Sequence, residues 1–204
     1  MDYVKKFIRH VEQETAKHKV KLTLAEAPYV IVAPRTRGNG FFDEEHMELA
    51  CSCGKPRKLW LPILVHEYSH FEQWRDQCRA WTGGDLGNKD SSGEMFAWIS
   101  GKRLPKRLVH LYVTKTRQLE LDCEKRALKN IKKFKLPLDA KAYCQRANSY
   151  IHFHNYIEQS RKWYKVGQEP YAVKEVYGAM PTHLNGNASR TPRKYFDLFE
   201  KYCV

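Results

Sequence analysis

The stretch that decides the fold runs from Leu59 to Trp74 and reads LWLPILVHEYSHFEQW. Its apolar residues recur at helical spacing, and Pro62 stands near the front of the run, which suits the first turn of a helix. We predict a helix over residues 59–81. Residues 66–70 of this helix, HEYSH, form the pattern H-E-x-x-H.

This pattern has the residue types and the spacing of a metal site. Residues four apart on a helix lie on one face, so His66 and His70 can both reach one ion, while Glu67 points to the side where a water on that ion would lie. Two neutral imidazoles suit Zn²⁺ and leave room for a third protein ligand and a water. Burying two histidines and a glutamate among apolar residues is costly without a compensating partner, so the context favours a metal over purely structural histidines.

The third ligand has to come from elsewhere in the chain. An extended H-E-x-x-H-x-x-G-x-x-H motif would place a histidine at position 76, but this chain has Asp76, which points away from the metal on a continuous helix. Better candidates are Glu120 and Glu124, which share one face of a second helix predicted over residues 106–135. One carboxylate can ligate zinc and the other can bind a ligating histidine and fix its tautomer. The alternative is that both carboxylates only form ion pairs with Arg117, Lys125 or their neighbours.

Together, the two motifs resemble a known family. His66-Glu67-Tyr68-Ser69-His70 with Glu120-x-x-Cys123-Glu124-x-x-Ala127 is similar to the gluzincin zinc metallopeptidases, and particularly to small intracellular zincins of the ImmA/IrrE type. The resemblance covers residues 59–77 and 115–134. It implies an α+β, zincin-like fold that is mostly helical, with a small sheet whose edge strand lies above the active-site helix. It also implies that His66, His70 and Glu120 hold Zn²⁺ and that Glu67 is the general base of peptide hydrolysis, which agrees with the chemistry of these residues.

Zincins bind a protein or peptide substrate as an added strand on a sheet edge. The short strand predicted over residues 46–53 is the expected edge, and its candidate substrate-binding residues are Glu48, Leu49, Ala50 and Cys51.

A developing oxyanion also needs a hydrogen-bond donor. His152 and Tyr156 are four residues apart on a helix expected from about Ala140, and either could stabilise the oxyanion. The alternative for each residue is packing in an aromatic core.

The amino-acid composition limits the classes to which the protein can belong. The chain has 204 residues, 42% of them hydrophobic, which is enough to bury the core of one domain. No apolar run approaches the roughly 20 residues of a membrane span, and the N-terminus lacks the pattern of a signal peptide. We therefore expect a cytoplasmic protein without a membrane partner, whose six cysteines are reduced; a bacterial or phage origin fits this reading.

We predict one zincin-like domain over residues 1–204, with strands at 27–33 and 46–53 and a turn at 35–40. Its predicted parts are an N-terminal helix (3–18) with the small sheet (1–58), the active helix (59–81), a loop (82–105), the third-ligand helix (106–135) and a C-terminal helical part (138–204).

The net charge of +13 is unevenly spread. Residues 102–135 hold twelve basic residues and three acids. The positive electrostatic potential of such a stretch attracts polyanions. The alternative function is therefore a catalytically silent zincin-fold binding protein, associated with nucleic acid through this stretch. The intact Glu67 favours the enzyme, because a scaffold would not need the base.

Overall fold

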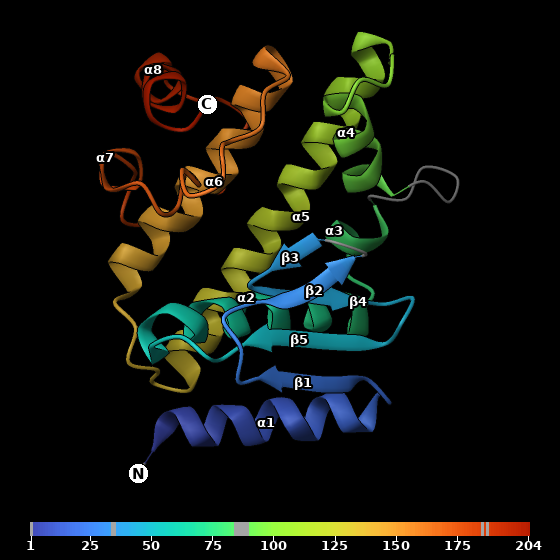
Figure 1. Cartoon of the computed structure of the whole chain (residues 1–204), viewed down its shortest axis with the longest axis vertical. Coiled ribbons are helices and arrows are strands. Elements are labelled where there is room, and N and C mark those ends of the chain that lie inside the picture. The colour runs from blue at the N-terminus through green and yellow to red at the C-terminus, as the bar shows by residue number, and fades with distance from the viewer. Residues whose placement is uncertain (1, 34–35, 84–89, 185, 187) are drawn as a thin grey trace. The chain divides into compact units, whose positions relative to one another are not determined.

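The computed structural model describes residues 2–33, 36–83, 90–184, 186 and 188–204 (Figure 1). The chain forms two compact units, the first from residues 1–78 and 123–138 and the second from residues 79–122 and 139–204. The fold is α+β and mostly helical, with a small mixed sheet. Among the described residues, none of the helices has the length and apolar character that a membrane crossing requires. The single domain over 1–204 stays a prediction.

The first unit contains a three-stranded sheet in the order β1-β5-β4. Its central strand, β5 (Glu48–Ser52), runs parallel to β1 (Lys21–Ala25) and antiparallel to β4 (Gly40–Asp43). A separate antiparallel pair joins β2 (Val30–Ala33) to β3 (Thr36–Gly38).

Two of these five strands, β2 and β5, were predicted from the sequence. The turn predicted at 35–40 is wrong for residues 36–38 and 40, which belong to strands; Arg35 lies outside the described residues. The missed strands are short, and those in the three-stranded sheet form because β5 pairs with them across the chain, which no local pattern reveals.

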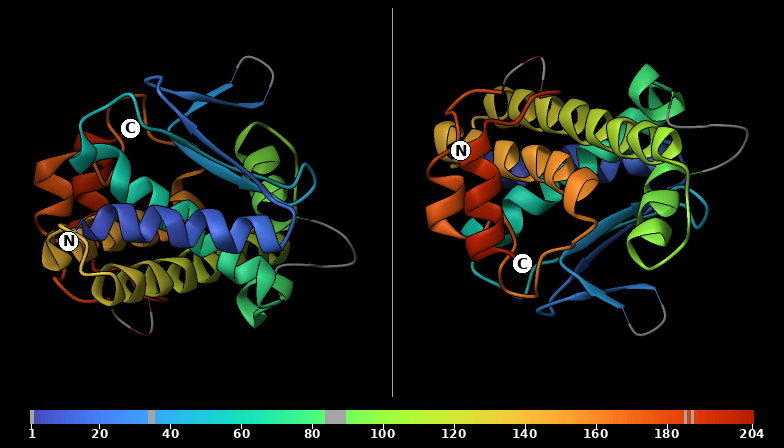
Figure 2. Two further views of the ribbon diagram at one scale, coloured as in Figure 1. Left: turned by 90° about the horizontal axis from the view of Figure 1, so that it is seen from below. Right: turned by 90° about the horizontal axis from the view of Figure 1, so that it is seen from above.

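Helices cover this sheet. In α1 (Tyr3–Lys17), Asp2 caps the N-terminus and Val4, Phe7 and Val11 are buried, and the helix lies alongside β1 (Figure 2). The longer α2 (Arg57–Arg75) packs against β4 and β5.

The active helix predicted over residues 59–81 and the observed α2 differ at both ends. Because α2 begins at Arg57, Pro62 lies inside the helix and not in its first turn. The helix also stops at Arg75, since Gln77 adopts a positive φ of 46° that an α-helix does not accommodate, and α3 (Arg79–Thr82) is separate.

The second unit is helical. It contains α3, α4 (Ser91–Ile99), α6 (Ala140–Ser160), α7 (Lys174–Tyr177), α8 (Arg193–Tyr202) and the first part of α5 (Lys106–Lys133), whose residues 123–133 belong to the first unit. Asp139 caps α6, as its position before the apolar run suggests. The predicted loop at 82–105 is wrong where α4 forms, because Asp90 caps the amides of Ser92 and Gly93. Residues 84–89 of that loop lie outside the described residues.

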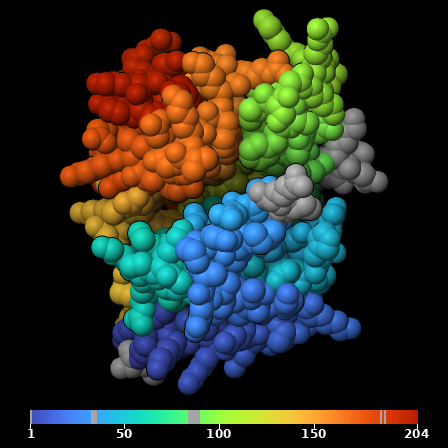
Figure 3. Space-filling view, viewed as in Figure 1, coloured from blue at the N-terminus to red at the C-terminus, as the bar shows by residue number. Residues whose placement is uncertain are grey.

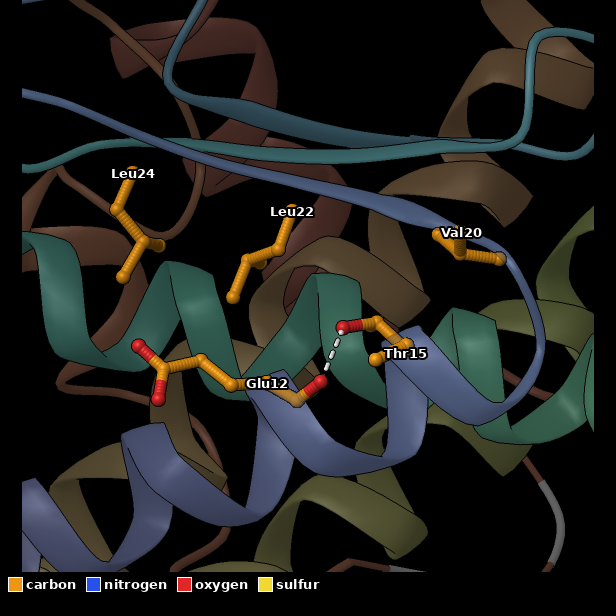
Figure 4. Close-up of a pocket in the computed structure, with 6 residues that line it drawn as sticks. Glu12, Thr15, Val20, Leu22 and Leu24 are labelled. Carbon is orange, nitrogen blue, oxygen red and sulfur yellow. Dashed lines mark hydrogen bonds between the residues drawn. The ribbon is translucent and has the colours of Figure 1, made fainter.

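A pocket of about 320 Å³ lies between α1 and β1 (Figure 4). Its lining includes Leu22, Leu24 and Val20, with Glu12 as its one titratable side chain. A single carboxylate among apolar residues is not a catalytic or metal-binding group of residues, so the chemistry has to be sought elsewhere.

Candidate metal centre

Helix α2 brings His66 and His70 together as their spacing predicts. Their Nε2 atoms lie 3.2 Å apart, and the ring centroids are 4.7 Å apart with the planes almost perpendicular. Two imidazole nitrogens bound to one tetrahedral zinc at about 2.0–2.1 Å would be roughly 3.3 Å apart. The two ε nitrogens therefore already stand at the separation that such an ion needs.

The δ nitrogens of both rings face hydrogen-bond acceptors. His70 Nδ1 lies 2.8 Å from Gln73 Oε1, and His66 Nδ1 lies 3.2 Å from Glu124 Oε1. A carboxylate and an amide oxygen only accept, so each neutral imidazole carries its proton on Nδ1 and presents a lone pair at Nε2. Two lone pairs facing each other at 3.2 Å repel unless a proton or a metal ion lies between them, so the arrangement is compatible with a bound metal ion.

Glu124 is the predicted partner of a ligating histidine. It is buried on α5, and its Oε1 lies 3.2 Å from Nδ1 of His66, which is the contact that this prediction requires; the role itself stays a prediction. Burial lowers the pKa of His66, but the neighbouring Cys123 and Glu124 raise it more, and the net pKa lies well above its ordinary value. Glu124 thus both orients the ring and increases its basicity.

Cys123 is also part of this cluster. Among the described residues, His66, His70 and Cys123 offer ligand atoms that lie within 4.8 Å of one another. However, Cys123 Sγ lies 3.6 Å from Nδ1 of His66 and 3.3 Å from its carbonyl oxygen, whereas the two histidines converge through Nε2. This geometry places the thiol behind the His66 ring, in the position of a supporting group.

Glu120 lies one helical turn before Glu124 on α5, in the part of that helix that belongs to the second unit. Residues four apart share a helix face. Its role as third ligand stays a prediction.

Glu67 lies beneath strand β4. The backbone N–H of Phe42 donates to its carboxylate, and a Cβ built on Gly40 would come within 2.9 Å of Glu67 Cγ. Burial raises the pKa of the Glu67 carboxyl, although His66 and the Phe42 N–H act in the opposite direction. A raised pKa brings a carboxylate closer to the range in which a general base works.

The predicted edge strand is wrong. Glu48, Leu49, Ala50 and Cys51 belong to β5, which is paired on both sides and therefore has no open edge. The edge strands of this sheet are β1 and β4, because β5 lies between them, and the sequence analysis missed both.

His152 and Tyr156 are packed inside the second unit. His152 Nδ1 lies 2.8 Å from Thr191 Oγ1, and Tyr156 donates to Glu200 while its ring stacks on Phe153. Burial lowers the pKa of His152 to about 4 and raises that of Tyr156 to about 12. These contacts match the packing alternative, and the oxyanion role stays a prediction.

The sequence analysis assigned no role in the site to three residues that support it, namely Gln73, Cys123 and Gly40. Gln73 had a readable signal, since it follows His70 by three residues on one helix. Cys123 and Gly40 had none, because their roles depend on contacts between distant segments.

Comparisons of the sequence with protein family models, with curated proteins and with solved structures find no match. The interpretation of the site therefore rests on its own geometry.

Proposed function

We propose that this protein is a zinc metallopeptidase with a zincin-like fold, resembling the gluzincins of the ImmA/IrrE type. The observation that carries the proposal is the convergence of His66 and His70 through Nε2 at 3.2 Å, each with its Nδ1 facing an acceptor. The adjacent Glu67 supports an enzyme over a silent binding protein, because neither the fold nor metal binding requires a carboxylate there.

His66, His70 and Glu120 would hold the ion. Bound Zn²⁺ would supply a Lewis acid that lowers the pKa of a water ligand to about 7. Glu67 takes the proton from the attacking water and passes it to the leaving amine. Gln73 and Glu124 keep the two rings in the required tautomer.

The outer edge of β4 is the proposed substrate-binding strand. Ser52 N–H donates to the Asn39 carbonyl, and residues of an antiparallel pair alternate in their bonding, so Phe41 bonds to β5 while Gly40 and Phe42 direct their backbone groups outwards. The Phe42 N–H contact with Glu67 agrees with this alternation. A peptide added to this edge would pass beside the general base.

The test compares Glu67→Gln with Glu72→Gln, a matched change on the same helix at a residue that accepts from Asn130. The probes are β-casein and a mixed library of quenched fluorescent peptides. We expect wild-type protein and Glu72→Gln to cleave and to carry about one equivalent of zinc. Glu67→Gln should keep the zinc and lose at least about a hundredfold in cleavage rate, since a missing general base is worth roughly 10²–10⁴.

Cleavage by Glu67→Gln at the wild-type rate would remove the assigned base. A wild-type protein that neither binds zinc in equilibrium dialysis nor cleaves the probes would overturn the proposal. Zinc binding that depends on His66 and His70, without any cleavage, would instead support the silent binding protein.

A further inference from the structure

A groove of about 510 Å³ lies in the first unit between α1 and the end of α5, and we call it the α1 groove. Its floor includes His10 and Phe134, whose rings are 4.9 Å apart. The full lining consists of Asp2, Lys5, Lys6, Arg9, His10, Gln13 and Phe134. Figure 3 shows α1, in dark blue, at the surface of the first unit.

The cations of the groove lack the acidic partners that other basic residues of this unit have. Lys5, Lys6 and Arg9 are exposed, and none of them forms an ion pair within the described part of the chain. By contrast, Lys17 pairs with Glu14 at 2.5 Å and Lys21 with Glu48 at 2.9 Å. Uncompensated charge is therefore concentrated at one end of α1.

The last turn of α5 adds to this field from the other side. Lys133 Nζ lies 5.0 Å from the centroid of the Phe134 ring, and Lys132 and Lys135 are exposed beside it. These lysines are the end of the basic stretch at residues 102–135. The one acid in the lining, Asp2, accepts from the amides of Val4 and Lys5 as the N-cap of α1 and so is already engaged by the helix.

A membrane surface is the wrong partner for this helix. An interfacial helix inserts its apolar face into the bilayer. In α1 that face, with Val4, Phe7 and Val11, is buried in the core of the unit and cannot be inserted.

A single strand of nucleic acid fits better. Proteins that bind single strands combine a basic groove that follows the phosphates with aromatic rings for the bases. Here Lys5 and Arg9 are one helical turn, or about 6 Å, apart along the groove. Tyr3, whose side chain is 40% exposed, precedes Lys6 by three residues on the same helix. A duplex is wider than one strand and would meet only the rim.

We propose that the α1 groove binds the backbone of single-stranded nucleic acid through Lys5, Lys6 and Arg9. The proposal is independent of the peptidase function, because none of these residues contacts the candidate metal centre.

Fluorescence anisotropy with a labelled oligothymidylate of about 15 nucleotides tests it. We expect Lys5→Gln/Lys6→Gln/Arg9→Gln to weaken binding at least tenfold at about 50 mM salt. The slope of log Kd against log salt should become shallower by about 2, since each phosphate contact contributes about 0.7. The matched control is Lys17→Gln/Lys19→Gln/Lys21→Gln, which removes the same charge between the last residue of α1 and the first residue of β1 and should keep the wild-type Kd within twofold.

Three results would overturn the proposal. They are no binding by the wild-type protein at about 50 mM salt, an equal loss in both triple variants, and competition by polyglutamate or by duplex DNA as effective as competition by unlabelled oligothymidylate. Circular dichroism of both variants verifies that the first unit stays folded.

Discussion

At the scale of the residue, the buried histidines of α6 couple the stability of the second unit to pH. Burial and the charge of Arg117 lower the pKa of both His152 and His154 to about 4. His154 is fully buried and its Nδ1 donates to the carbonyl of Tyr150. In the unfolded chain both residues would titrate near pH 6.5.

We therefore expect acid to destabilise the second unit before its carboxylates titrate. Between pH 6.5 and 4 the unfolded chain binds more protons than the folded protein, so the stability is complete above pH 6.5 and is lost as the pH falls towards 4. The loss is roughly 3 kcal/mol for each histidine. Urea unfolding at several pH values, followed by near-ultraviolet circular dichroism, measures it.

His154→Phe, or His154→Gln if the larger ring is not accommodated, should remove about half of this pH dependence. His183→Gln, at an exposed position, is the matched control and should leave it unchanged. A variant with the full wild-type slope would show that His154 is not kept neutral by burial.

At the scale of the element, strand β4 approaches α2 closely because residue 40 is glycine. A Cβ at this position would lie 2.8 Å from Ile63 Cγ2 and 2.9 Å from the Ala50 carbonyl and from Glu67 Cγ. Gly40→Ala should cost about 1–3 kcal/mol of stability through overpacking and displace Glu67. We expect peptidase activity to fall at least tenfold while zinc content is unchanged.

Thermal unfolding and zinc content check this expectation, with Gly186→Ala as the matched control because an added Cβ there meets nothing within 4 Å. Full activity in Gly40→Ala would show that the close approach of β4 does not position the base.

Other helices and strands show what could and could not be predicted from the sequence. The spacing of His66 and His70 is local, so an i, i+4 rule was enough to bring them together. The edge strand was misassigned because strand order depends on pairing between β1 and β5, which are more than 20 residues apart. The helix α4 was missed because Gly93 and its serine neighbours read as a loop, although Asp90 makes them a capped first turn.

At the scale of the whole molecule, α5 is the helix that both units share. It carries Cys123 and Glu124 in the first unit and Glu120 in the second. The identity of the third metal ligand therefore decides which turn of α5 zinc would link to α2, that of Glu120 or that of Cys123. Zinc at a hundred times its Kd should raise the free energy of unfolding by about 2.7 kcal/mol.

Glu120→Gln and Cys123→Ser separate the two cases. If Glu120 ligates, Glu120→Gln should weaken zinc binding by far more than about a hundredfold, while Cys123→Ser, which removes only a supporting contact with His66, should weaken it by no more than about 10–100-fold. Hydrogen exchange should then show zinc protecting α2 together with α5 on both sides of residue 122. The reverse order of affinities, with protection confined to α2 and residues 123–133, would make Cys123 the ligand and contradict the gluzincin assignment. The resemblance to the gluzincins depends on Glu120 as a metal ligand. This residue lies one helical turn before Glu124, which contacts His66.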